Sequence, residues 1–367
     1  MQLAILLVYL VNLAVAGDAT SPAIERAKSG RQADVLPISV GHQFGLIDKN
    51  GKVLLKPQFD FIGDISGGLF RVIKNGRYGY LSTSGKIVIP PQFERAGEFS
   101  EGLARAQQGG KWGFIDEVGR WRIKPEFDYC SDFSDGRAGV KIGELWGFID
   151  RNGQMVVKPE FHVIHGFREG LALVWGKDRT GYIKPDGTMA IPVSGRAYPF
   201  VNGLAQITID KKLAFIDKTG KVVVPPEFES LGAFSEGLVS AKSNGKYGFV
   251  DRSGHWVVRP EFEAAGVFTE GQALVRVAGK WGFIDRTGKL TIPAVFDEAE
   301  RFSEGLAAVK KDGKWGYIDL GGSMVISPKF DRAWWFGFES PGIARVEIGR
   351  SFGWIRKDGK YIWNPSE

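Results

Sequence analysis

The string Trp-Gly-Phe-Ile-Asp recurs along this chain with nearly constant spacing. Successive copies are 34 residues apart, except for one step of 33 residues and a last step of 37. A fixed period of about 20–50 residues indicates an array in which each unit packs mainly against its neighbours. The sequence therefore predicts a tandem repeat of about ten units. The second position of the string falls on Gly45, Gly79, Gly113, Gly147, Gly181, Ala214, Gly248, Gly282, Gly316 and Gly353.

Each unit carries strand and turn signals in the same order. In the copy that begins at Trp281, the string is followed by an Asp-x-x-Gly turn, by Ile292-Pro293 and Phe296, and by the segment Phe-Ser-Glu-Gly-Leu-Ala at residues 302–307. Alternating apolar residues on both sides of short glycine turns predict a three-stranded meander. The turn aspartates recur wherever the turn recurs, so we expect them to bond backbone N–H groups and not to act as acids or bases. They are Asp48, Asp116, Asp150, Asp217, Asp251, Asp285 and Asp319.

This phased pattern resembles the WG-repeat family, also called KWG repeats. The resemblance covers roughly residues 36–363, and the copies at residues 112–145 and 247–280 keep the same order throughout. The family implies a β-rich repeat array used for recognition. It brings no shared catalytic residues.

Residues 35–367 are accordingly expected to form one all-β array of stacked meanders. Glycine supplies 50 of the 367 residues, and Gly or Pro interrupts the chain too often for paired helices of a helical repeat. A single meander cannot bury enough apolar surface alone, so neighbouring units must stack, with the two Phe residues of each connector filling the gap. Ten units exceed the four to eight blades of ordinary propellers, which favours an open, curved solenoid. The alternative is a closed propeller-like ring.

The first residues have the character of an export signal. Residues 3–16 are apolar apart from Asn12 and end in Ala14-Val15-Ala16, the small-x-small pattern that signal peptidase requires. We therefore expect a signal peptide at residues 1–16, a mature N-terminus at Gly17, a flexible polar leader at residues 17–34, and an exported protein with no membrane span after cleavage. The alternative is an uncleaved N-terminal anchor.

The charges argue against nucleic acid as a partner. The chain has 48 basic and 42 acidic residues, for a net charge of +6, and the two signs alternate in columns along the repeats. Nucleic-acid binding favours a segregated basic face. We expect the columns to pair across neighbouring units. Acidic positions of the connectors are Glu101, Asp135, Glu169, Glu236, Glu270 and Glu304; basic positions are Lys52, Lys86, Arg120, Lys221, Lys289 and Lys360 after the turn glycine, and Arg77, Lys111, Lys212, Lys246, Lys280 and Lys314 before the aromatic residue.

Residues with intrinsic reactivity give no support for catalysis. Cys130 is the single cysteine and stands where other units carry small apolar residues, so it is interpreted as a buried apolar side chain. His162 and His165 form the only close histidine pair, without a nearby carboxylate or thiolate to complete a metal site. Nucleotide-binding and hydrolase motifs are missing. We therefore expect a protein that is not an enzyme and has no cofactor or metal.

The aromatic position of the repeat string is predicted to be structural. It accepts Trp, Tyr or Phe, as packing requires, so Trp281→Ala is expected to cost about 3–5 kcal/mol of stability. Trp121 and Trp256 occupy another column, held elsewhere by aliphatic residues, and are predicted to be core.

Two places depart from the pattern. Trp334, Trp335, Phe336 and Phe338 lie in the expanded last unit, near Arg332 and Glu339, where adjacent aromatic residues cannot all point inward. We interpret them as a candidate binding surface, the alternative being a hydrophobic end cap. The fifth unit is the most degraded, with Thr180 in place of the aromatic residue and Lys184-Pro185-Asp186-Gly187 in place of the usual turn. It marks either a bend or a seam between the first four and the last five units, or simple drift.

Two functions fit these observations. The first is an exported, non-enzymatic scaffold that binds an unknown protein partner through its extended repeat surface. The second is a binder of carbohydrate or cell-envelope polymer that uses the exposed aromatic residues.

Overall fold

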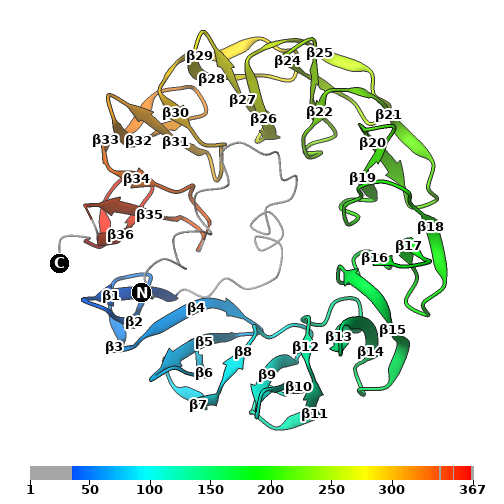
Figure 1. Ribbon diagram of the computed structural model, residues 1–367. Helices are drawn as coiled ribbons and strands as arrows, with labels where there is room; N and C mark the ends of the chain where they lie inside the picture. Colours follow the sequence, from blue (N-terminus) through cyan, green and yellow to red (C-terminus); the bar gives the residue numbers. More distant parts are fainter. Residues whose placement is uncertain (1–34, 339, 350, 365–367) are drawn as a thin grey trace. The chain divides into compact units, whose positions relative to one another are not determined.

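The computed structural model describes residues 35–338, 340–349 and 351–364. All regular structure in these residues is β, with no helix (Figure 1). The strands form nine antiparallel sheets, and each sheet runs in sequence order from one edge to the other. Within them ten meanders follow one another along the chain, as the period predicts. The all-β tandem meander fold is thus confirmed. The predicted signal peptide and leader lie outside the described residues.

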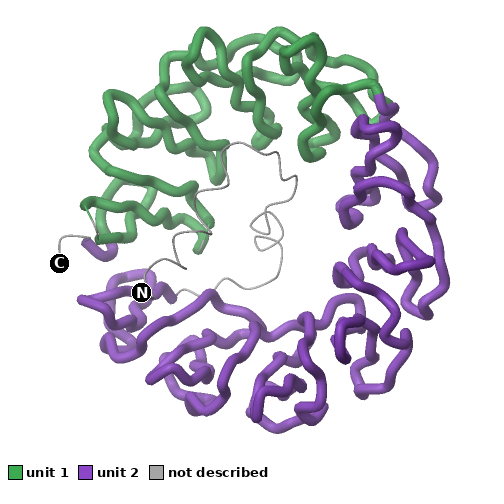
Figure 2. Tube along the Cα trace, in the orientation of Figure 1, with its two compact units in different colours: residues 1–30, 227–361, 366 green, residues 31–226, 362–365, 367 purple. Residues whose placement is uncertain are grey.

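The chain divides into two compact units (Figure 2). The described part of unit 2 comprises residues 35–226 and 362–364, and that of unit 1 comprises the described residues between 227 and 361. Unit 2 holds β1 (Val35–Val40), β2 (Gln43–Asp48), β3 (Val53–Phe59), β4 (Phe61–Ser66), β5 (Leu69–Lys74), β6 (Arg77–Ser82), β7 (Ile87–Phe93), β8 (Arg95–Ala96), β9 (Ala104–Gln108), β10 (Lys111–Ile115), β11 (Trp121–Phe127), β12 (Tyr129–Cys130), β13 (Arg137–Ile142), β14 (Leu145–Asp150), β15 (Met155–Ile164), β16 (Ala172–Gly176), β17 (Thr180–Ile183), β18 (Met189–Pro192), β19 (Leu204–Ile209) and β20 (Lys212–Asp217).

The remaining strands follow in the same rhythm. Unit 1 holds β22 (Ser230–Leu231), β23 (Val239–Ser243), β24 (Lys246–Val250), β25 (Trp256–Phe262), β26 (Ala264–Thr269), β27 (Gln272–Val277), β28 (Lys280–Ile284), β29 (Leu290–Phe296), β30 (Glu298–Ala299), β31 (Leu306–Lys311), β32 (Lys314–Asp319), β33 (Met324–Phe330), β34 (Arg332–Ala333), β35 (Ile343–Ile348) and β36 (Ser351–Arg356). Two strands, β21 (Val222–Phe228) and β37 (Tyr361–Trp363), have residues in both units. None of the described residues forms a helix that is long and apolar enough to cross a membrane.

The glycine of the repeat string is required by a close backbone approach. It lies on the middle strand, opposite a bulge in the third strand: in the meander of β5, β6 and β7, Tyr80 pairs with Ile89 but Tyr78 pairs with Phe93. A Cβ added at Gly79 would lie 2.6 Å from the carbonyl oxygen of Ile89 and 2.6 Å from the nitrogen of Pro91. Such contacts are sterically forbidden, so the position favours glycine because any side chain would push the two strands apart.

Apolar side chains are buried mainly between successive repeats. One cluster joins Phe283, Phe296 and Phe302 of one repeat to Val309 and Ile318 of the next. Both connector Phe residues in this cluster are at most 4% exposed, which confirms their predicted packing role. Neighbouring repeats therefore share their cores, as expected for a repeat that cannot bury its apolar face alone.

The Asp-x-x-Gly turns have the predicted geometry. In the turn at Asp285, one carboxylate oxygen accepts the backbone N–H groups of Thr287 and Lys289 at 2.8 and 3.2 Å. Gly288 has a φ of +90°, which glycine adopts without strain. Equivalent bonds form at Asp48, Asp116, Asp150, Asp217, Asp251 and Asp319.

The burial of the tryptophans corrects two expectations. In the repeat string, Trp112 is 5% exposed, whereas Trp281 is only half-buried. The stability cost of Trp281→Ala should therefore lie at or below the lower end of the expected range of about 3–5 kcal/mol. Trp121 and Trp256 are also half-buried and stand in a column whose aliphatic members are exposed. The prediction that they are core residues is wrong. Trp121 instead packs its ring edge-on against Phe93 of the preceding repeat, with centroids 5.6 Å apart.

Other pattern breaks have plain structural outcomes. Cys130 is fully buried, which confirms its apolar interpretation, and burial raises the pKa of its thiol. His162 and His165 are exposed, and the His165 ring packs against Trp175 at 5.5 Å. The fifth meander continues the sheet of the fourth, in the seven-stranded order β12 to β18. Because the division between the compact units falls after Pro226, the interpretation of the fifth unit as a seam is wrong.

Candidate binding hollow in unit 1

Each regular connector ends in a tight two-residue turn between a serine and a leucine. Ser303 and Leu306 exchange both backbone hydrogen bonds, and Glu304 and Gly305 between them have φ values of +53° and +84°. Two consecutive positive φ values are the signature of a type I′ turn. Glutamate is unfavourable in this region of the φ/ψ map, so its recurrence there needs a compensating interaction.

That interaction is a ladder between successive connector turns. The serine hydroxyl donates to a phenylalanine carbonyl in the next connector, as from Ser235 to Phe268 at 2.6 Å. The acidic residue accepts the N–H of the next turn glycine, as Glu270 does from Gly305 at 2.9 Å. The same serine hydrogen bond is donated by Ser66, Ser100, Ser134 and Ser303. The same N–H bond is accepted by Glu101, Asp135, Glu169, Glu236 and Glu304.

Most ladder acids also have a cationic partner, although it is not the one predicted. The partner is the second residue of an Asp-x-x-Gly turn or its equivalent: Arg286, after Asp285, lies 3.5 Å from Glu236, and Lys357, after Arg356, lies 3.3 Å from Glu304. Glu101 with Arg151 and Glu169 with Lys218 repeat this arrangement. Lysines before the aromatic residue instead reach the aspartate after the connector's first Phe, as Lys280 reaches Asp297. The charge columns therefore pair, but in a different register from the one that the sequence suggested.

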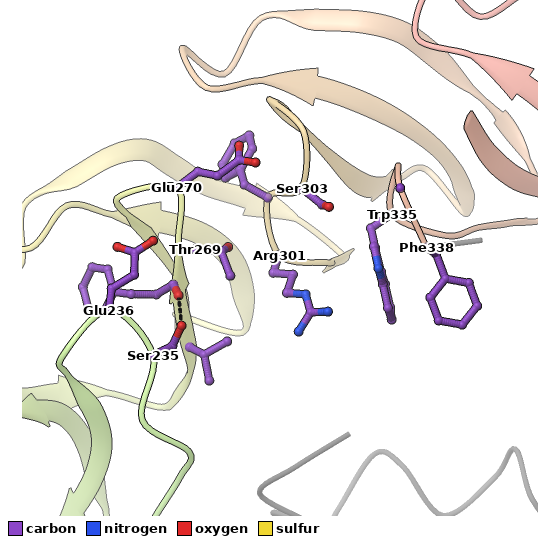
Figure 3. Close-up of a pocket in the computed structure, with 12 residues that line it drawn as sticks. Ser235, Glu236, Thr269, Glu270, Arg301, Ser303, Trp335 and Phe338 are labelled. Atoms are coloured by element: carbon purple, nitrogen blue, oxygen red, sulfur yellow. Dashed lines mark hydrogen bonds between the residues drawn. The ribbon is translucent and has the colours of Figure 1, made fainter. Parts of the chain in front are cut away.

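Four consecutive connectors of unit 1 border a hollow of about 290 Å³, the unit 1 hollow (Figure 3). Its lining consists of Ser235 and Glu236, residues 267–270, residues 301–303, and Trp335, Gly337 and Phe338. The first three contributions come from regular connector turns and the last from the expanded unit. The ladder thus forms one wall of this hollow, and the irregular aromatic segment forms the other.

A stacked cation stands between these walls. The guanidinium carbon of Arg301 lies 4.7 Å from the centre of the Trp335 ring, and the Phe338 ring meets Trp335 edge-on at 4.8 Å. Figure 3 shows the Arg301 side chain extending toward Trp335 and away from the carboxylates of Glu236 and Glu270. Within the described residues the Arg301 guanidinium has no hydrogen bond or salt bridge. Its N–H donors are therefore available to a ligand.

The ladder is incomplete at the same place. Thr269 occupies the serine position, yet its buried hydroxyl has no hydrogen-bond partner among the described residues. Glu270 accepts its N–H bond from Gly305, but the position that supplies a cation to other ladder acids is held by Leu320, which is 41% exposed. Within the described part of unit 1, Glu270 has no ion pair. The hollow thus contains an unbonded hydroxyl and a carboxylate without a counter-ion among the described residues.

Burial tunes the charges next to the hollow. It raises the pKa of Glu300, only partly opposed by the neighbouring Arg301. Burial also lowers the pKa of Arg301, although a guanidinium remains charged at neutral pH. Because Glu236 is neutralised by Arg286, the cation of Arg301 dominates the side of the hollow that Trp335 borders.

The four aromatic residues singled out in the sequence separate into different roles. Trp335 and Phe338 line the hollow, half-buried. Trp334 is half-buried outside the lining, with the Arg345 guanidinium 5.0 Å from its ring centre. Phe336 is fully buried and belongs to a core cluster, so its assignment to an exposed surface is wrong. Arg332 is exposed and outside the lining, and Glu339 lies outside the described residues.

Phe336 is buried because it keeps the ordinary connector position despite the expansion. Its ring packs edge-on against Tyr317 at 4.9 Å, and in the preceding repeat Phe302 packs against Phe283 at 4.7 Å in a tilted arrangement. The three added residues follow it along the chain, so the regular packing site is filled first and the excess aromatic surface remains outside.

Sequence reasoning missed the polar half of the hollow. Arg301 was detectable, because its column holds Asp64, Glu98, Asp132, Gly166, Pro199, Ala233 and Val267 in earlier units and a cation only here. The substitution of a cation by Leu320 was detectable in the same way. The unbonded hydroxyl of Thr269 was not detectable, because the sequence shows only that serine and threonine both carry a hydroxyl donor.

The two serine hydroxyls of the lining are already hydrogen-bonded. Ser235 and Ser303 donate their hydroxyl hydrogens to backbone carbonyls, and no histidine lines the hollow to act as their base. The described residues contain no group of three or more His, Cys, Asp or Glu side chains placed to hold a metal ion.

Comparison with known families identifies the repeat. The WG containing repeat matches nine consecutive segments: residues 44–78, 78–112, 112–146, 146–174, 181–212, 214–247, 247–281, 281–315 and 315–361. The chain belongs to the WG-repeat family. The resemblance inferred from the spacing of the glycines is thus confirmed. A search of curated protein sequences found no match.

Solved structures similar to this WG-repeat protein share little sequence with it. A structure described as the eukaryotic initiation factor is 11% identical, with 90% of this chain and 95% of that chain covered and a TM-score of 0.48. PorZ of Porphyromonas gingivalis, a bacterial surface component of the type-IX secretion system, is 12% identical over 90% of this chain and 52% of its own, with a TM-score of 0.29. Apo AztD from Citrobacter koseri is 12% identical over 89% and 92%, with a TM-score of 0.34.

Proposed function

We propose that this WG-repeat protein is an exported, non-enzymatic binding protein that holds a protein partner at the unit 1 hollow. The observation that carries the proposal is the convergence of unused groups there. Among the described residues, Arg301 makes no hydrogen bond or salt bridge, Thr269 has an unbonded hydroxyl, and Glu270 lacks the cation found beside four of the other ladder acids. Aromatic residues with an adjacent arginine are typical anchors of protein interfaces.

The tryptophans are not arranged as open platforms for sugar rings. A guanidinium covers a face of each ring, from Arg301 on Trp335 and from Arg345 on Trp334. Stacking a sugar on those faces would require displacing a favourable cation–π contact. This arrangement favours a partner that engages the arginine together with the aromatic edge, as a polypeptide segment does.

Capture from the envelope fraction tests the binding role. The full-length wild-type protein is compared with a Trp335→Ala, Phe338→Ala double variant, and with Trp121→Ala as a control that removes an equally half-buried tryptophan from unit 2. The expected result is one protein retained by wild type and control, lost by the double variant, and binding wild type directly after purification. Retention by wild type and both variants contradicts the assignment to the hollow. Glycan-array binding lost only in the double variant supports the carbohydrate alternative.

Two further measurements test the other parts of the proposal. A fluorophosphonate probe should leave Ser235 and Ser303 unmodified, because their hydroxyls bond carbonyl oxygens and have no base; labelling of either serine would indicate a hydrolase. Mass spectrometry of protein from the periplasm or medium should find an N-terminus at or near Gly17. Recovery of the protein in the cytoplasm with Met1 intact would contradict export.

A further inference from the structure

We infer that the unit 1 hollow recognises a carboxylate on the partner, presented beside an apolar side chain that packs on Trp335 and Phe338. This inference rests on the proposed function and specifies the chemistry of its ligand. The carboxylate comes from an acidic side chain or from the end of a polypeptide.

The position of Arg301 carries the argument. Its guanidinium carbon lies 4.7 Å from the centre of the Trp335 ring, a contact that restricts the side chain, and Arg301 belongs to the lining of the hollow. A preoriented guanidinium matches the two oxygens of a carboxylate and loses little side-chain freedom on binding. By contrast, Arg105 of β9 is already committed, to Asp132 at 2.9 Å and to the carbonyl of Cys130.

The other charged groups around the hollow are compatible with an anion beside Arg301. Glu236 is held by Arg286, and Glu304, whose carboxylate approaches Gly337, is held by Lys357. Glu300 lies outside the lining and interacts electrostatically with Arg301. Of the acids that line the hollow, Glu270 has no ion pair within the described residues, and in Figure 3 it lies across the hollow from the Arg301 guanidinium. It therefore weakens the binding of an anion without preventing it.

The apolar part of the ligand follows from the two rings. Trp335 and Phe338 meet edge-on and form an angled surface next to the cation, with Val267 and Phe302 also in the lining. A ligand whose carboxylate reaches Arg301 places its neighbouring side chain against this surface. The combination selects an acidic residue adjacent to a large apolar one, and not a diffuse negative surface.

Selection from two random peptide libraries on the full-length protein tests this inference. One library displays internal segments and the other displays free C-termini. The expected result is enrichment of Asp or Glu within two residues of Leu, Ile, Phe or Met in the first library, or of a terminal apolar residue in the second. The library that is enriched identifies the source of the carboxylate. Enrichment of basic peptides, or none in either library, overturns the inference.

Fluorescence anisotropy with one enriched peptide then assigns the contact. Arg301→Gln should weaken binding by about tenfold or more, and Arg301→Lys by less, because lysine keeps the charge but not the paired donors. Replacing the peptide's carboxylate by an amide should produce a loss of similar size that does not add to the first. Arg259→Gln, at an exposed arginine of β25 outside the lining, should bind like wild type. Equal affinity of Arg301→Gln and wild type overturns the inference.

A second variant has the opposite expected sign. Glu270→Gln removes a negative charge that repels the peptide's carboxylate. It should increase the affinity for the acidic peptide by about two- to fivefold at low salt. Weaker binding would show that Glu270 holds a cation of the ligand, which contradicts the inference. If the envelope partner is retained by Arg301→Gln but lost by the Trp335→Ala, Phe338→Ala double variant, the proposed function stands and the carboxylate assignment fails.

Discussion

The connector that ends at Ser100 and the one that contains Trp335 occupy equivalent places in their repeats, but only the first is fully used for stacking. Ser100 donates to the carbonyl of Phe133 in the next connector, and Glu101 accepts from Gly136 and pairs with Arg151. In the last connector Gly337 and Phe338 replace this Ser-Glu pair. Within the described residues no further connector follows the last one, so its aromatic segment borders the hollow and makes no onward ladder bonds.

The largest effect is expected where repeats depend on backbone contact. Gly79→Ala places a Cβ 2.6 Å from the backbone of the facing strand and should cost about 5 kcal/mol or prevent folding of the surrounding repeats. The matched control is Gly76→Ala in the neighbouring turn, where φ is +71° and a Cβ meets no atom within 4 Å, with an expected cost of about 1 kcal/mol from backbone strain. Denaturant melts with equal losses would show that steric approach is not what favours glycine.

A smaller effect separates a packed tryptophan from one that lines the hollow. Trp112→Ala should cost about 3–5 kcal/mol, because a nearly fully buried ring leaves a cavity between repeats. Trp335→Ala should cost less than about 2 kcal/mol, because its ring is half-buried against Arg301 and Phe338. Peptide affinity should change in the reverse order. A large stability loss in Trp335→Ala with unchanged affinity would support the end-cap interpretation.

The buried carboxyl of Glu300, next to the hollow, should make the stability of this connector depend on pH. Burial raises its folded pKa above the unfolded value of about 4.3, so its stabilising contribution is complete below that value and is lost as the pH rises through the folded pKa. Glu300→Gln should therefore raise stability at pH 7 by about 1 kcal/mol and leave it nearly unchanged near pH 3. Melts at both pH values measure this difference. A variant that is less stable at pH 7 would show that the carboxylate has a stabilising partner.

The smallest effect is expected at an exposed repeat turn. The hydroxyl of Thr287 and backbone N–H groups lower the folded pKa of Asp285 below the unfolded value of about 3.9. This contribution is present above the unfolded pKa and is lost as the pH falls through the folded pKa. Asp285→Asn should therefore reduce stability slightly at pH 7 and flatten its dependence below about pH 4. An unchanged acid melting profile would contradict this assignment.

Much of the fold was predictable because local rules recur in every unit. The spacing of the glycines indicated ten meanders, Asp285 and its equivalents were correctly assigned to turns, and Cys130 was correctly placed in the core. Such features depend on a few neighbouring residues whose chemistry is the same in each copy. Repetition supplies its own internal comparison, so an error in one unit is corrected by the others.

The candidate site was only half predictable from the same pattern. Trp335 and Phe338 were identified as excess aromatic residues, but Phe336 was placed with them although it fills the ordinary core position. Trp121 was assigned to the core from its aliphatic column, whose members the structure shows to be exposed. The exposure of a side chain depends on how closely the next repeat packs against it. A column of similar residues in the sequence does not reveal how close that packing is.

The sequence by itself determined the period, the meander, the turns and the family, because these follow from backbone sterics and local hydrogen bonding. The tertiary structure alone decided which groups remain unused. Among the described residues the hydroxyl of Thr269 has no acceptor, Leu320 holds the position that would supply a cation to Glu270, and Arg301 packs on Trp335 of the next connector. Each of these depends on atoms from different repeats that meet only after stacking, and a carboxylate ligand would be recognised by that assembled set.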